Sequence, residues 1–89
     1  MPPTELAKAL GLTIRINRTR RGWSQRELAQ AARMDPKHVS MIENGLRDVG
    51  LSTQERIAAA LGMPLARLLA EAEEELARSR RLLEGREES

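Results

Sequence analysis

The stretch SQRELAQAARMDPKHVSMIENG, residues 24–45, decides the fold that we predict for this chain. It contains two helical patterns, over about residues 24–32 and 36–44, joined by a connection of about three residues. A connection that short forces two helices to cross steeply, at ~90–120°. One side of the second helix is therefore left protruding from the pair.

Both predicted helices carry signals at their ends. Ser24 and Glu27 have the spacing of a capping box, in which two side chains satisfy backbone N–H groups at the start of a helix. Asp35 is a typical N-cap, and Pro36 suits the first helical position because its missing N–H is not needed there. Gly45 follows the second helix, where glycine commonly ends one.

The second helix has two unlike sides. Val39 and Ile42 point together toward the helix predicted over residues 24–32. Ala29 of that helix leaves room for a close crossing of the two backbones. The opposite side is not needed for the core. It contains Lys37, Ser40, Met41 and Asn44.

The whole chain reads as one all-α domain with an aliphatic core. Its 89 residues include one Trp, no Phe or Tyr and four Pro. A first helix is predicted over residues 4–21, with Thr4 as the N-cap candidate. The alternative is a proper start only near Leu10, because Gly11 costs ~1 kcal/mol relative to alanine. A fourth helix is predicted to open with a second capping box, formed by Ser52 and Glu55.

The composition excludes several classes of function. Without cysteine there is no disulfide framework and no thiolate metal site, and His38 has no partners at ligand spacing. Because no catalytic pattern is present, we expect no enzymatic activity, no metal and no cofactor. No apolar run reaches the ~18–20 residues of a membrane span, and the N-terminus does not have the pattern of a signal peptide, which suits a cytoplasmic protein.

The formal net charge is only +2, but the charge is unevenly distributed. Residues 1–50 hold nine Lys and Arg against five Asp and Glu, whereas residues 51–89 hold six against eight. The basic half contains the protruding helix side, where a polyanion would bind.

Residues 10–69 resemble the lambda-repressor-like, Xre-type family of five-helix DNA-binding domains. The motifs SQRELA, VSMIENG and IAAALG stand at the family's spacings. The resemblance implies a helix-turn-helix DNA-binding domain, which we place over residues 1–70. The residue pattern predicts a C-terminal helical extension over residues 71–89 with a frayed end. The resemblance also implies a transcription regulator of a bacterium, an archaeon or a phage that binds double-stranded DNA.

The resemblance also indicates which residues contact DNA. The base-reading positions are Pro36, Lys37, Ser40 and Met41. We expect phosphate contacts from Ser24, Gln25, His38, Asn44 and Arg47. For Asn44 the alternative is that it only ends the helix, and for Met41 and His38 the alternative is plain exposure. The family commonly joins an arginine of helix one to a glutamate ending helix three, and these are Arg18 and Glu43 here.

Three residues depart from the family pattern. Arg33 stands at a turn position where glycine is preferred, so a left-handed backbone there costs ~1 kcal/mol. Asn17 and Gln54 stand where apolar residues are usual, which leaves the local packing of helices one and four open.

The last helix is predicted from Pro64 to about Leu83, and the polar EGREES after it is expected to fray. Spacings of four and three residues form a heptad seam along it, which predicts a homodimer interface. Ser79 occupies the seam position between Leu76 and Leu83. The interface residues are Leu65, Leu69, Ala72, Leu76 and Leu83. The alternative is that Leu65 and Leu69 close the core of the monomer.

We therefore expect a sequence-specific transcriptional regulator, a repressor or an autoregulated controller, that binds a pseudo-palindromic operator as a homodimer. Its half-sites would lie ~10–10.5 base pairs apart, or a multiple of that. The alternative is an antitoxin-type module that neutralises a protein partner and also binds its own operator. A non-specific architectural protein fits poorly because the net charge is low for binding by phosphate neutralisation alone.

Overall fold

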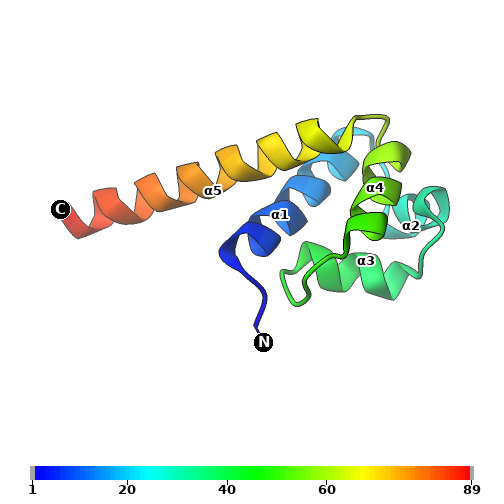
Figure 1. Ribbon diagram of the computed structural model, residues 1–89, viewed down its shortest axis with the longest axis horizontal. Helices are drawn as coiled ribbons and strands as arrows, with labels where there is room; N and C mark the ends of the chain where they lie inside the picture. The colour runs from blue at the N-terminus through cyan, green and yellow to red at the C-terminus, as the bar shows by residue number, and fades with distance from the viewer. Residues whose placement is uncertain (1, 89) are drawn as a thin grey trace.

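The computed structural model describes residues 2–88, with side chains up to residue 85. Its helices are α1 (Glu5–Arg20), α2 (Gln25–Ala32), α3 (Pro36–Glu43), α4 (Leu51–Ala60) and α5 (Leu65–Glu88). Figure 1 shows α1 between α5 and α3, with α2 and α4 together at one end. The all-α prediction is confirmed. Within residues 2–88, no helix is long and apolar enough to cross a membrane.

Helix α1 begins where the predicted range of residues 4–21 places its start. Thr4 is its N-cap, and Oγ1 of Thr4 accepts a hydrogen bond from the backbone N–H of Ala7 at 3.0 Å. The prediction of Thr4 as the N-cap is confirmed, and the expectation that the helix starts properly only near Leu10 is wrong. Gly11 lies inside the helix because α3 passes directly against it, and a Cβ atom there would overlap the carbonyl oxygen of Ile42. This packing outweighs the poor helix propensity of glycine.

The predicted ends of α2 and α3 are confirmed. Ser24 Oγ accepts from the backbone N–H of Glu27 at 3.1 Å, and the N–H of Ser24 donates to Glu27 Oε1 at 3.0 Å. Asp35 Oδ1 accepts from the N–H of Lys37 at 2.8 Å. Between the two helices, Arg33 has the left-handed backbone expected at the turn, with φ 57° and ψ 52°.

The start of α4 differs from the prediction. The N-cap is Gly50, and no side chain caps the helix, so the predicted capping box of Ser52 and Glu55 is absent. Ser52 already lies inside the first turn and is therefore not at the capping position. Gln54 instead donates from Nε2 to the carbonyl oxygen of Val49 at 2.8 Å, which ties the first turn of α4 to the preceding loop.

The hydrophobic core lies where the helices meet. Leu28 and Ala29 of α2 are completely buried, and Val39 and Ile42 of α3 are only 1 % exposed. The complete burial of Ala29 therefore agrees with the close helix crossing that was predicted there. The inner side of α3 packs into the core. This packing fixes the direction in which the outer side of α3 points.

The first half of α5 closes this core. Leu68 and Ala72 are completely buried, and Leu65 and Leu69 pack against the same cluster. The assignment of Ala72 to a dimer interface is therefore wrong, because its side chain is enclosed within the monomer. The packing of Leu65 and Leu69 against this cluster favours the alternative that these two residues close the core of the monomer.

A polar contact joins α5 to α1. Asn17 is only 6 % exposed, and its Nδ2 donates to the carbonyl oxygen of Thr13 at 3.0 Å and to Glu71 Oε1 at 2.9 Å. Beyond this contact, α5 extends past the body of the molecule (Figure 1) and continues to Glu88, further than the predicted end at Leu83. Fraying was predicted for residues 84–89. The side chains of residues 86–89 lie outside the described residues, so the fraying stays a prediction.

Candidate nucleic-acid interface

Helix α3 presents its outer side to solvent at the surface of the domain. Pro36 and Lys37 are exposed, and Ser40 and Met41 are partly buried. The predicted contrast between the two sides of the helix is confirmed, except that the thioether of Met41 is less exposed than its helical phase indicates. Four neighbouring side chains are thus accessible along a short helix that is held only by its inner side.

The C-terminal end of α3 is closed by Asn44. Its Nδ2 donates to the carbonyl oxygen of Ser40 at 2.8 Å and lies 3.4 Å from Ser40 Oγ. Asn44 is also the C-cap residue, and its backbone N–H donates to the same carbonyl group. The structure thus gives Asn44 the helix-ending role that the sequence left as an alternative. A phosphate contact by Asn44 stays a prediction.

The start of α2 lies beside the end of α3. Gln25 is the first residue of α2, and its Nε2 donates to Glu43 Oε1 at 3.0 Å. The first backbone N–H groups of a helix have no partners within it and carry a partial positive charge, which favours a phosphate. The Gln25–Glu43 bond therefore fixes the start of α2 relative to the outer side of α3.

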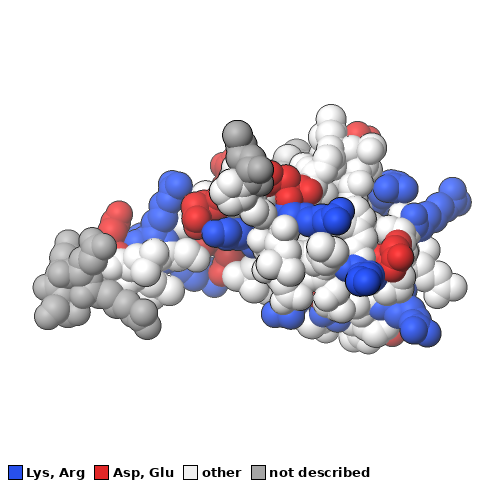
Figure 2. Space-filling view, turned by 90° about the horizontal axis from the view of Figure 1, so that it is seen from below, with Lys and Arg blue, Asp and Glu red and all other residues white. Residues whose placement is uncertain are grey.

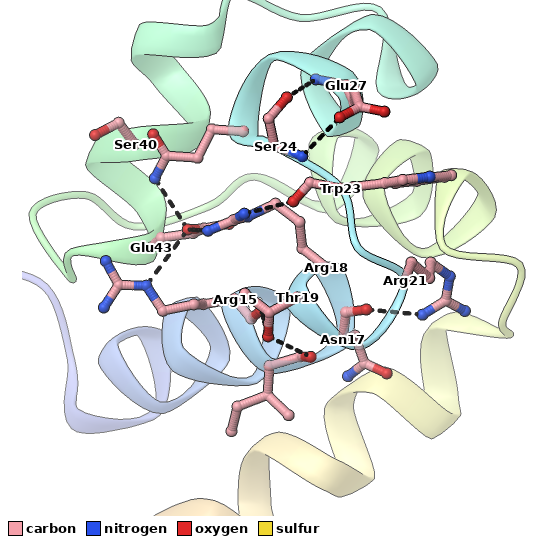
Figure 3. Close-up of polar contacts among 12 residues, drawn as sticks. Arg15, Asn17, Arg18, Thr19, Arg21, Trp23, Ser24, Glu27, Ser40 and Glu43 are labelled. Carbon is pink, nitrogen blue, oxygen red and sulfur yellow. Dashed lines mark hydrogen bonds and ion pairs between the residues drawn. The ribbon is translucent and has the colours of Figure 1, made fainter.

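Glu43 is the centre of a buried ionic cluster (Figure 3). Arg18 Nε donates to Glu43 Oε2 at 2.7 Å, and Arg18 Nη2 donates to Glu43 Oε1 at 2.9 Å. Arg18 Nη1 also donates to the carbonyl oxygen of Trp23 at 2.7 Å, so it joins α1, α3 and the segment before α2. The hydrogen bond with Glu43 raises the pKa of Arg18 above its ordinary value, against the opposing effect of burial. The pair expected from the resemblance is thus present.

One member of this cluster was not identified from the sequence. Arg15 Nε lies 3.6 Å from Glu43 Oε1. The spacing of three residues between Arg15 and Arg18 places both on one side of α1, and this signal was available in the sequence. The contact between Gln25 and Glu43 had no such signal, because it depends on how α2 and α3 cross.

The remaining predicted phosphate residues lie on α3 and in the loop after it. His38 is partly buried on α3, and Arg47 is exposed in the loop that follows. Figure 2 shows the molecule from below, with a largely uncharged central area of the helical body that is bordered by several Lys and Arg side chains and by some Asp and Glu side chains. Within the described residues, no group of three or more His, Asp or Glu is arranged to hold a metal ion. This surface suits contact with an anionic polymer.

Comparison with known proteins agrees with this arrangement. A family model described as a helix-turn-helix domain matches residues 9–72. The chain belongs to this helix-turn-helix family. A protein described as a hypothetical transcription factor, from Neisseria meningitidis serogroup B, is 38% identical over 72 residues, which cover 81% of this chain and 68% of that protein.

Two solved structures of regulatory proteins are also similar to this chain. The clp gene regulator ClgR from Corynebacterium glutamicum has a TM-score of 0.86 and 32% identity, covering 93% of this chain and 88% of that chain. The restriction-modification controller protein C.AhdI from Aeromonas hydrophila has a TM-score of 0.66 and 35% identity, covering 71% of this chain and 94% of that chain. At the level of the family, the prediction of a DNA-binding transcriptional regulator is confirmed.

Proposed function

We propose that this helix-turn-helix protein binds a specific operator in double-stranded DNA through the outer side of α3 and regulates transcription there. The observation that carries the proposal is the division of α3 into two sides. Val39 and Ile42 are buried, while Lys37 is exposed on the other side together with parts of Ser40 and Met41. A major groove ~12 Å wide accepts a single helix presented in this way.

The side chains of α3 suit different features of the base pairs. The ammonium of Lys37 is a donor for guanine O6 and N7, and the hydroxyl of Ser40 donates or accepts. The exposed part of Met41 is apolar and suits a thymine methyl group. Pro36 begins the helix and lies at the end that would enter the groove first.

Phosphate contacts would set the position of α3 in the groove. The start of α2, with Ser24 and Gln25, is held against the end of α3 by the bond from Gln25 to Glu43. A phosphate bound there would therefore fix the register of Lys37 and Ser40 on the bases. His38 and Arg47 would hold the backbone on either side of the groove, and Arg47 is the more exposed of the two.

We also propose that the regulator acts as a homodimer in the cytoplasm and has no enzymatic activity of its own. Because α3 has only eight residues, one copy contacts too few base pairs to select a site in a genome. Two copies on a two-fold axis double the contacts. The outer half of α5 offers an apolar surface for the second copy: Leu76 is partly buried, and Leu82 and Leu83 are 66% and 59% exposed.

The test is a selection of duplexes from a random pool by the purified protein. We expect enrichment of one pseudo-palindromic sequence with half-sites ~10–10.5 base pairs apart, or a multiple of that. A scrambled duplex of the same composition is the control for non-specific binding. Failure to enrich any sequence, while the protein remains folded, would contradict the proposed function and favour the antitoxin-type alternative.

A further inference from the structure

Arg15 is the least constrained member of the Glu43 cluster. Its side chain is 47% exposed, whereas that of Arg18 is 11% exposed and that of Glu43 is fully buried. The distance from Arg15 Nε to Glu43 Oε1 is 3.6 Å, compared with 2.7 Å for the closest contact of Arg18. An ion pair with one half-exposed member contributes little to folding. The fold therefore does not explain why an arginine stands at this position.

Glu43 is already satisfied without Arg15. Arg18 binds both carboxylate oxygens, and Gln25 donates a third hydrogen bond to Oε1. Arg15 and Arg18 together carry two positive charges against the single negative charge of Glu43. The cluster thus keeps one positive charge, and this charge lies on its solvent side, at Arg15.

The guanidinium of Arg15 points in a defined direction. Its contact with Glu43 is made by Nε, and Figure 3 shows the two terminal nitrogens extending away from the carboxylate. Ser40 extends to the same side of Glu43 in this view. The same oxygen, Oε1, also accepts from Gln25 at the start of α2. Arg15 thus lies next to both elements that would face the DNA.

We propose that Arg15 is a phosphate-binding residue that contacts the DNA backbone where it passes the start of α2 and the end of α3. Among the described residues, the terminal nitrogens of Arg15 make no hydrogen bond. A guanidinium presented in this way matches a phosphate group, and Glu43 would hold it in position through Nε. The inference rests on the proposed function, and it assigns a DNA contact to α1, a helix otherwise occupied with packing.

The test uses full-length protein, a duplex recovered by selection from a random pool, and a scrambled duplex of the same composition. We expect Arg15→Ala to weaken binding to both duplexes, by roughly tenfold at ~0.1 M salt. The slope of log affinity against log salt should flatten by about 0.9 per bound protomer. Arg15→Lys should keep most of the slope, because the charge remains. The midpoint of thermal unfolding should stay unchanged in both variants.

Arg20→Ala is the matched control. It removes the same charge from the same helix, but Arg20 borders the hollow beside Glu71, Glu74 and Glu75 of α5. Equal salt slopes for Arg15→Ala and the parent, or equal losses in Arg15→Ala and Arg20→Ala, would overturn the inference. A loss caused by unfolding of Arg15→Ala would also overturn it. If the parent itself binds neither duplex, the proposed function fails, and the inference fails with it.

Discussion

The carbonyl oxygen of Ile42 occupies the space that a Cβ atom of Gly11 would need. Helices α1 and α3 therefore cross with one backbone directly against the other, and only glycine permits this at the crossing point. The contact fixes the inner side of α3, so the direction of its outer side depends on a residue of α1.

Alanine usually stabilises a helix relative to glycine, but at position 11 we expect the opposite effect on the free energy of unfolding. We expect Gly11→Ala to lower the free energy of unfolding by about 1–3 kcal/mol, because the methyl group forces α3 away from α1. Gly85→Ala is the control, since a Cβ atom at Gly85 in α5 meets nothing within 4 Å, and it should be neutral or slightly stabilising. Urea denaturation measures both, and an unchanged Gly11→Ala protein would contradict the close crossing.

The outer side of α3 should carry the base specificity. Lys37→Ala should lose ~1–3 kcal/mol of binding to the selected duplex and much less on a scrambled one. Arg47→Ala should weaken binding to both duplexes alike and flatten the salt dependence, because a phosphate contact carries no sequence information. Titration of each variant with both duplexes distinguishes the two patterns. Unchanged discrimination by the Lys37→Ala protein would argue against α3 as the reading helix.

Arg18 should matter for folding. Arg18→Ala leaves the buried carboxylate of Glu43 without its main partner, and we expect the free energy of unfolding to fall by about 3 kcal/mol. The hydrogen bond with Glu43 raises the pKa of Arg18 above the ordinary pKa of arginine. The charged guanidinium therefore contributes its full share to the free energy of unfolding below that ordinary pKa, and this share is lost only as the pH rises above it. Thermal and urea melts measure the loss. Full stability together with lost DNA binding would instead identify Arg18 as a direct DNA contact.

The turn between α2 and α3 should become more stable with glycine. Arg33 has a positive φ of 57°, which costs a residue with a Cβ atom ~1–2 kcal/mol. Arg33→Gly should therefore raise the free energy of unfolding by up to about 1 kcal/mol, whereas Arg33→Ala should not, because alanine keeps the Cβ atom. A similar gain in both variants would show that the side chain of Arg33, and not its backbone, is the source of the cost.

The homodimer should depend on the outer half of α5. Leu82→Glu together with Leu83→Glu should weaken self-association in sedimentation equilibrium and leave the monomer folded, because neither side chain belongs to the core. Leu51→Glu is the control, since Leu51 of α4 is 63% exposed and thus similarly accessible. If Leu51→Glu disrupts the dimer and the α5 variant does not, the interface lies on α4.

Signals that act within one turn of a helix were read correctly for α2 and α3 but not for α4, where the predicted capping box of Ser52 and Glu55 is absent. Ser24 with Glu27, and Asp35 with Pro36, set the starts of α2 and α3 because their hydrogen bonds close over two or three residues. The left-handed turn at Arg33 was expected from the family resemblance, in which glycine is preferred at this position. These local features were enough to predict the pair of helices and the side of α3 that protrudes.

Contacts between residues far apart in the chain were decided by the tertiary structure. Gly11 looks like a helix breaker until Ile42 is placed against it, and Ala72 fits a dimer seam equally well until the core encloses it. The positions of Arg15 and Gln25 around Glu43 likewise depend on how three helices cross. A helical period states which residues share a side, but burial on that side requires a partner surface, and only the packed structure supplies it.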